Sequence, residues 1–327
     1  MPIEYRVASG GRVVVLADVP EELPEGLVWL DAKNPSDAEL ARLDEIMGFE
    51  IPNRQDISEI ELSSRLYKET GALVMIASLL PKSEGRSLPP RPAAFVIRRD
   101  LLLTVRYDQF YSFERVAAEL TRGGDTHTPV EIFSRLLEEA VADRADNLEF
   151  SMRHLEELTT RLFDSAPSEA PESTQEGVKL DAALRRIGKM GENVSNIRES
   201  ITSLQRVVNF AVTYMSEDWL GDQKIVLASL KTDLAALSDE AGFFMNKLSF
   251  NLDATLGMIN IDETKIIRLL SIVTLLLSPP TLIAGIYGMN FRNMPELEWP
   301  LGYALSLGLM LATAIVSIWY LRRKRWM

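Results

Sequence analysis

The stretch LLSIVTLLLSPPTLIAGIYGMNF, residues 269–291, decides the fold of this chain together with WPLGYALSLGLMLATAIVSIWYL, residues 299–321. Each run is uncharged and about 23 residues long. A helix rising ~1.5 Å per residue needs about 20 residues to cross ~30 Å of hydrocarbon. The two runs therefore predict membrane-spanning helices at about 269–288 and 299–321, joined by an outer loop over 289–298.

The charged residues that flank the two runs predict the orientation of the chain. Lys265 and Arg268 precede the first run and a basic tail, 322–327, follows the second, whereas the connector holds Arg292 against two glutamates. Lys and Arg close to membrane spans favour the cytoplasmic side. The N-terminus has no basic segment leading into an apolar core, so no cleaved signal is predicted. We expect a multi-pass protein of the cell (inner) membrane with cytoplasmic N- and C-termini.

Composition excludes several classes of protein. The 327 residues carry a net charge of −12, with two histidines and no cysteine. An acidic chain argues against a nucleic-acid partner, and the missing thiols remove disulfides and thiolate metal sites. No phosphate-cradling loop or nucleophile elbow occurs, so we expect no enzyme and no cofactor. The excess of carboxylates serves either solubility or the attraction of cations, and charge alone leaves both readings open.

Residues 1–127 predict a cytoplasmic α+β domain. Strands are expected at Arg12–Leu16 and at Leu27–Leu30, and Ala93–Val105 is expected to form a hairpin. Ser36 and Glu39 have capping-box spacing before an apolar helical pattern, and Gly48 ends that pattern.

Residues 128–264 predict long cytoplasmic helices, and residues 265–327 form the predicted transmembrane domain. The helical region begins at a capping box, Thr128 to Glu131, that has proline in its first turn, and it has two breaks, at 167–177 and 216–222. From about residue 222 no strong breaker occurs before Pro279, so one helix is expected to run into the first span. Up to Gly288 such a helix is roughly 100 Å long, and its cytoplasmic part would form a stalk.

Four hydroxyl residues share one face of the first span. Ser271, Thr274, Ser278 and Thr281 are spaced by three, four and three. In a ring of helices this face would line a water-filled axis, as pore-lining residues. Alternatively, the hydroxyls bond their own i−4 carbonyls or serve as small packing residues between membrane helices. Two spans cannot enclose an aqueous path, so a pore requires a closed homo-oligomer, with the second span toward lipid.

The end of the first span predicts an entrance for cations. The C-terminus of a helix carries roughly half a negative charge, and Gly288-Met289-Asn290 follows it. Mg²⁺ releases its water reluctantly, and the Asn290 amide can accept hydrogen bonds from a hydration shell. Alternatively, Asn290 is a C-terminal helix cap.

Tyr287-Gly288-Met289-Asn290-Phe291, followed by Met294-Pro295-Glu296-Leu297 after the first of two C-terminal spans, resembles the CorA family of divalent metal-ion transporters. The motif resemblance covers about residues 250–327. It implies a funnel-shaped homopentamer in which an α+β cytoplasmic domain is followed by long α-helices and two C-terminal transmembrane helices. It also implies passive transport, closed by intracellular cation. The roles that it implies are a selectivity filter at Gly288, Met289 and Asn290, a hydrophobic gate at Leu270 and Ile267, cation attraction at Glu296 and Glu298, and a regulatory metal sensor at Asp253.

The expected cargo is Mg²⁺, with Co²⁺ and Ni²⁺. The alternative is a Zn²⁺ transporter similar to the ZntB branch, coupled to protons or not. That branch tends to lose the methionine of the tripeptide and the acidic loop, whereas this chain keeps Met289, Glu296 and Glu298. A more distant alternative is a membrane-tethered structural or signalling protein. The expected partners are further copies of the chain, the lipid bilayer and divalent metal ions.

Overall fold

The computed structural model of the chain describes residues 4–9, 12–16, 26–58, 65–82, 88–122, 127–163, 173–289, 294–295 and 299–324. By its internal contacts the chain divides into two compact units. Unit 1 comprises Met1–Ser168 and Ala183–Leu252, and unit 2 comprises Glu169–Ala182 and Asp253–Met327. The division at 127 and 264 expected from the sequence stays a prediction.

The strands of the described part of unit 1 form one mixed sheet in the order β2-β1-β3-β7-β6-β5-β4. Strands β3 and β7 are parallel, and every other neighbouring pair in this order is antiparallel. The strands are β1 (Glu4–Ser9), β2 (Arg12–Leu16), β3 (Leu27–Lys33), β4 (Leu66–Glu69), β5 (Ala72–Leu79), β6 (Arg91–Ile97) and β7 (Leu102–Arg106). Three predicted features are therefore confirmed: β2, β3 and the β6–β7 hairpin.

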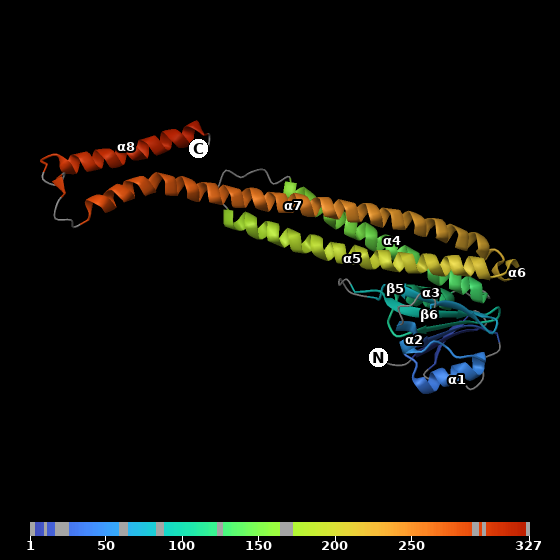
Figure 1. The fold of residues 1–327 in the computed structure, drawn as a ribbon. Helices are drawn as coiled ribbons and strands as arrows, with labels where there is room; N and C mark the ends of the chain where they lie inside the picture. The colour runs from blue at the N-terminus through green and yellow to red at the C-terminus, as the bar shows by residue number, and fades with distance from the viewer. Residues whose placement is uncertain are drawn as a thin grey trace. The chain divides into compact units, whose positions relative to one another are not determined.

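Helices cover both faces of the sheet. Figure 1 shows α1 (Asp37–Met47) and α2 (Arg54–Ser58) on one face, with α3 (Tyr111–Arg122) and the long helices on the other. Every residue of β5 is buried, because alternate side chains enter two different hydrophobic clusters. Met75 faces the cluster under the long helices and Val74 faces the cluster under α1.

Local sequence sets the ends of α1. The Ser36 hydroxyl accepts a hydrogen bond from the Glu39 backbone N–H, and the Glu39 carboxylate accepts one from the Ser36 backbone N–H at 2.7 Å. Gly48 closes the helix in the left-handed conformation, with φ 78°, which a residue without Cβ adopts at little cost. The predicted capping box and stop are both confirmed.

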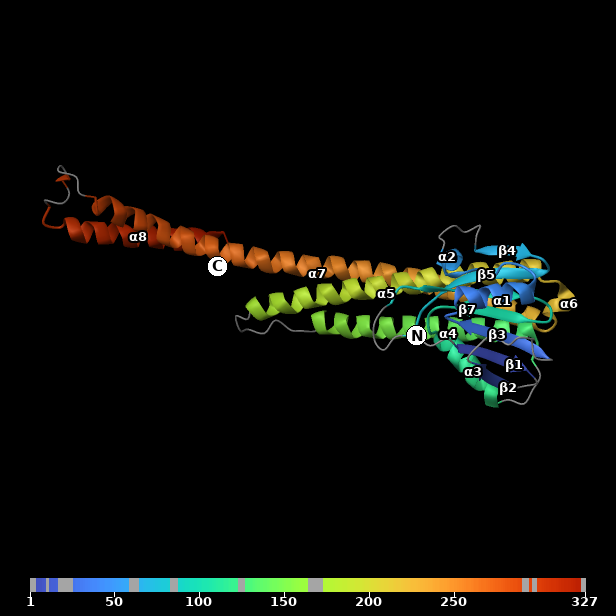
Figure 2. The ribbon, with the colours of Figure 1, turned by 90° about the horizontal axis from the view of Figure 1, so that it is seen from below.

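The long helices of unit 1 are α4 (Pro129–Phe163), α5 (Ser173–Tyr214) from Ala183 onward and the first part of α7 (Gln223–Tyr287), with the short α6 (Glu217–Leu220) before α7. They run side by side in both ribbon views (Figures 1 and 2). The first predicted break is shorter than expected, because α5 already begins at Ser173. The Pro-containing part of that break, 167–172, lies outside the described residues.

Buried polar groups join α4 and α5 to the sheet. The Arg144 Nε–H donates to the Ser200 hydroxyl at 3.0 Å, and that hydroxyl donates to the Ser78 carbonyl at 2.6 Å. Burial lowers the pKa of the Arg144 guanidinium to about 10, and the nearby Asp143 carboxylate opposes this shift. The seam between the two helices is thus fixed by hydrogen bonds as well as by apolar packing.

Unit 2 contains the second part of α7 and all of α8 (Gly302–Arg323). Both helices are long and apolar enough to cross a membrane. Pro279 and Pro280 lie inside α7, which continues past them to Tyr287. The prediction that one helix runs from about residue 222 into the first span is confirmed, with Gln223 as its first residue.

Candidate ion pathway

The hydroxyl stripe of α7 is exposed in unit 2. Ser271, Thr274, Ser278 and Thr281 are all exposed, and at 100° per residue they lie within about 80° of the helix circumference. Three of these hydroxyls donate to the carbonyl four residues earlier: Ser271 to Ile267 at 2.8 Å, Thr274 to Leu270 at 2.9 Å and Thr281 to Leu277 at 2.7 Å.

These intrahelical bonds determine what the stripe offers to a ligand. A hydroxyl has one proton and two acceptor lone pairs, so a hydroxyl that donates to its own helix turns acceptor oxygen outward. Such an oxygen suits a hydrated cation, because the protons of the hydration water point away from the ion. The sequence left self-bonding and pore lining as alternatives, and the geometry of the stripe accommodates both.

The opposite face of α7 is the covered one. Ile272, Leu276, Ile283 and Tyr287 are partly buried, and their centre lies about 180° around the helix from the hydroxyl stripe. Helix α8 runs back beside the end of α7 (Figures 1 and 2). Its own covered residues, Ser306, Ser317 and Leu321, recur at helical spacing. The second span therefore packs behind the first and leaves the hydroxyl face uncovered.

The two predicted gate residues precede the stripe: Ile267 lies one turn before Ser271, and Leu270 directly precedes it. Ile267 is 64% exposed and Leu270 is 67% exposed, so a single copy of the chain leaves both side chains uncovered. Ile267 lies on the same face as the hydroxyls, and Leu270 lies at its edge.

Helix α7 ends in a tight turn at the predicted filter. The Gly288 N–H donates to the Ala284 carbonyl at 2.9 Å, and the Met289 N–H donates to the Ile286 carbonyl at 3.2 Å. A Cβ atom at Gly288 would lie 3.1 Å from the Ala284 carbonyl oxygen, so the close turn favours glycine. Met289 is exposed. Asn290, Glu296 and Glu298 lie outside the described residues, so their predicted roles stay predictions.

Asp253, the predicted sensor, is exposed on α7 at the first residue of the second segment of unit 2. Among the described residues, no group of three or more His, Cys, Asp or Glu side chains is placed to hold a metal ion. One copy of the chain thus brings the stripe and the gate onto one helix face, but the described residues form no carboxylate cluster for a metal ion at Asp253.

Comparison with known proteins supplies the family. The sequence model of the CorA-like Mg²⁺ transporter protein family matches residues 24–323. The chain belongs to the CorA-like Mg²⁺ transporter family. The magnesium transport protein CorA of Wolinella succinogenes is 28% identical over 306 residues, covering 92% of this chain and 91% of that protein. The CorA protein of Pasteurella multocida is 28% identical over 304 residues, with 92% of each chain covered.

Solved structures agree with this assignment at the level of the fold. The complete structure of the CorA magnesium transporter from Methanocaldococcus jannaschii matches with a TM-score of 0.74 and 20% identity, covering 100% of this chain and 99% of that chain. The full-length CmaX protein matches with a TM-score of 0.67 and 15% identity, covering 99% and 97%. The expected fold is confirmed: an α+β domain, long helices and two C-terminal apolar helices. CorA is a family of membrane transporters and is not a known enzyme family.

Proposed function

We propose that this chain carries hydrated divalent cations passively across the cell (inner) membrane, with Mg²⁺ as the main cargo and Co²⁺ and Ni²⁺ as further cargo. The observation that carries this proposal is the difference in exposure between the two faces of α7: the hydroxyl stripe is exposed, and the partly buried residues lie on the opposite side. A stripe turned toward lipid would leave the outward acceptor lone pairs of its oxygens without donors, whereas a stripe turned toward a shared axis would meet water and ions.

The functional unit of this proposal is a closed homo-oligomer. Two spans per chain cannot enclose an aqueous path, so several copies of α7 must surround one axis with α8 outside. A subunit count of five follows from the resemblance to the family. The arrangement is supported by the apolar surface of α8, on which Leu311 is 65% exposed and Trp319 is 58% exposed. Such side chains suit lipid and the membrane interface.

The remaining residues have different roles at successive positions along the proposed path. Asn290 with Gly288 and Met289 forms the filter, where the amide holds the hydration shell of the ion. Glu296 and Glu298 attract cations to the outer mouth. Ile267 and Leu270 close the inner part of the path by excluding water, and Asp253 senses intracellular cation. The basic residues at the end of the chain support a cytoplasmic location for both termini.

The choice of Mg²⁺ over Zn²⁺ is supported by the names of the CorA relatives and by the retained Met289. Hydroxyl and amide oxygens are hard ligands, which suit Mg²⁺ better than the softer nitrogen and sulfur ligands that bind Zn²⁺. A filter that handles a hydrated ion discriminates weakly by softness, so Co²⁺ and Ni²⁺ are expected to pass as well.

The test is cation flux through purified full-length protein in liposomes that contain a fluorescent indicator. Mg²⁺, Co²⁺, Ni²⁺ and Zn²⁺ are compared with and without a pH gradient, and protein-free liposomes are the control. We expect Mg²⁺ entry that follows the Mg²⁺ gradient and needs no proton gradient. Zn²⁺ entry that requires the pH gradient would favour the ZntB-like alternative. No flux of any of the four ions would favour a membrane tether.

A further inference from the structure

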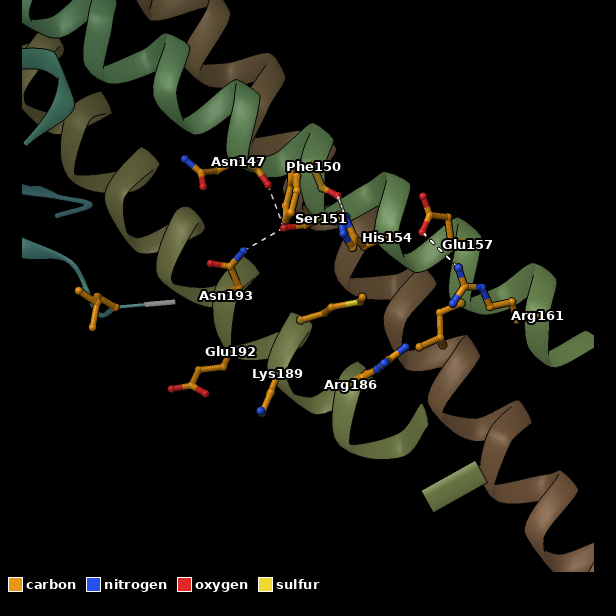
Figure 3. A pocket seen from close by; sticks show the side chains of 13 residues that line it. Asn147, Phe150, Ser151, His154, Glu157, Arg161, Arg186, Lys189, Glu192 and Asn193 are labelled. Carbon is orange, nitrogen blue, oxygen red and sulfur yellow. Dashed lines mark hydrogen bonds and ion pairs between the residues drawn. The ribbon is translucent and has the colours of Figure 1, made fainter. Parts of the chain in front are cut away.

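A cavity of about 910 Å³ lies between α4 and α5 in unit 1, on the soluble part of the chain. Ligand pockets in proteins are commonly about 300–1,000 Å³, so the cavity is large enough for a small organic molecule. Figure 3 shows its lining from close by. None of the residues to which the proposed function gives a role lines it.

Two hydrogen bonds fix the register of the helices beside the cavity. The Asn193 side-chain amide donates to the Ser151 hydroxyl at 2.9 Å, and Arg144 donates to Ser200 at 3.0 Å. From the first contact to the second, the residue number falls by seven on α4 and rises by seven on α5. The two helices are therefore antiparallel with a constant register. Continued by another ten residues, this register brings Arg161 of α4 to within about one turn of Arg186 of α5.

The end of the cavity at Arg161 and Arg186 is cationic. Arg161 and Arg186 line this end, and Glu157 lies 4.0 Å from Arg161 as an ion-pair partner, while Lys189 lines the cavity about one turn further along α5. Figure 3 shows the Arg186 guanidinium pointing from α5 toward α4, whereas Lys189 and Glu192 point away from α4. No ion-pair partner occurs for Arg186 or Lys189 among the residues that the structure describes. This local positive charge contrasts with the net charge of −12 of the whole chain.

The rest of the cavity offers an apolar and aromatic surface with a few hydrogen-bonding groups. Met190 and Leu158 supply its apolar lining, and the Phe150 ring packs against His154 at a tilt of 41° with ring centroids 4.0 Å apart. Phe150 is 55% exposed, which is unusual for a large aromatic side chain on a soluble helix. Near the Ser151–Asn193 hydrogen bond, Asn147 adds a further amide to the lining. The polarity therefore changes along the seam from neutral amides, through an apolar section, to cations.

We infer that this cavity binds a small organic phosphate monoester, with the phosphate between Arg186 and Arg161 and an aromatic or apolar body over Met190, Leu158 and the Phe150–His154 pair. A phosphate monoester carries about −1.5 to −2 charges at pH 7. The two guanidinium groups at this end outnumber the single Glu157 carboxylate beside them, so the local charge is complementary to a phosphate. Arginine guanidinium groups suit phosphate because they donate two hydrogen bonds in one plane. The inference is independent of the proposed function, because it concerns binding to the soluble unit.

The test is calorimetric titration of the full-length protein in detergent, without divalent cations, using AMP and inorganic phosphate as the two probes. AMP joins an aromatic body to a phosphate monoester, whereas inorganic phosphate supplies the anion alone. We expect saturable AMP binding, weaker binding of inorganic phosphate, and a loss of roughly 10- to 100-fold in AMP affinity in Arg186→Ala. Arg198→Ala is the matched control, because Arg198 is exposed on the same helix and does not line the cavity.

Each outcome decides the inference. AMP affinity that falls in Arg186→Ala and is unchanged in Arg198→Ala supports the site. Equal losses in the two variants would show a general charge effect and overturn it, as would an unchanged affinity in Arg186→Ala. Inorganic phosphate binding as tightly as AMP would remove the apolar body from the proposal. No saturable binding of either probe would reject the cavity as a phosphate site. Failure in any of these ways leaves cation flux, and hence the proposed function, untouched.

Discussion

Asp31 and Arg106 form a buried ion pair whose removal gives a sharp prediction for stability. Both side chains are 0% exposed, on the parallel neighbours β3 and β7. Arg106 donates to the Asp31 carboxylate from Nε at 3.0 Å and from Nη2 at 2.9 Å, and the Thr104 hydroxyl donates to it at 2.9 Å. The Trp29 indole N–H donates to Thr104 at 3.1 Å. Asp31→Asn keeps the shape of the side chain but removes its charge and replaces one acceptor oxygen by a donor.

The magnitude follows from what the substitution leaves behind. Arg106 keeps its charge in a fully buried site, and one of its N–H groups then faces another donor. Breaking a buried pair in this way costs about 3–5 kcal/mol of unfolding free energy. The matched control is Asp100→Asn, which breaks the Arg98–Asp100 pair at 2.7 Å, where the Asp100 side chain is 66% exposed. Solvent screening limits that loss to about 0–1 kcal/mol.

Urea unfolding of the full-length protein in detergent, followed by tryptophan emission, measures the difference. Trp29 is one of five tryptophans; it is buried and bonded into the network, so its share of the emission change reports the unfolding of the sheet. With an m-value of about 2 kcal/mol/M, Asp31→Asn is expected to lower the urea midpoint by about 2 M and Asp100→Asn by less than about 0.5 M. Equal midpoints for the two variants would refute the reasoning. Replacing both partners, as Asp31→Leu with Arg106→Met, is expected to recover much of the loss, because no uncompensated charge stays buried.

The remaining predictions concern the proposed pathway. Thr281→Val removes an outward oxygen and is expected to lower Mg²⁺ flux in liposomes at least about fivefold. The control is Thr313→Val on α8, where the threonine hydroxyl donates to the Met310 carbonyl, and this variant should leave the flux unchanged. Equal losses in the two variants would contradict the assignment of faces. Asn290→Ala is expected to abolish Mg²⁺ flux while size-exclusion chromatography shows an intact assembly, and normal flux would reject the filter. Asp253→Lys is expected to weaken closure by internal Mg²⁺, which is measured as Mg²⁺ flux at increasing Mg²⁺ concentrations inside the liposome. The control is Asp239→Lys, at an exposed position on the same helix. Inhibition that does not differ between the two variants would reject the sensor.

Elements whose signal is local were predictable from the sequence. The capping box at Ser36, the stop at Gly48, the start of α4 at Pro129 and the unbroken run of α7 all depend on residues within a few positions of one another. The two spans were equally clear, because a helix surrounded by hydrocarbon must be apolar along its whole length. The CorA motif was readable for the same reason, since it is one contiguous stretch.

Some elements of the sheet were missed because their signal is not local. Strand β5 is buried on both faces, so its residues do not alternate between polar and apolar, and its period does not distinguish a strand from a buried helix. The parallel pairing of β3 with β7 joins Asp31 to Thr104, which lie 73 residues apart. The cavity between α4 and α5 also escaped detection, because its cations lie on two helices whose register only the folded unit sets.

The sequence by itself determined that this chain has two spans, a long helix leading into the first, an α+β domain before it and a hydroxyl stripe on one face of α7. Spacing along one helix is enough for these conclusions, because 3.6 residues per turn convert sequence separation directly into a face. Only the tertiary structure decided which face α8 covers. Aliphatic side chains occupy the faces of the first span outside the hydroxyl stripe, so composition does not distinguish which of these faces lies toward α8, and packing between the two helices makes that choice.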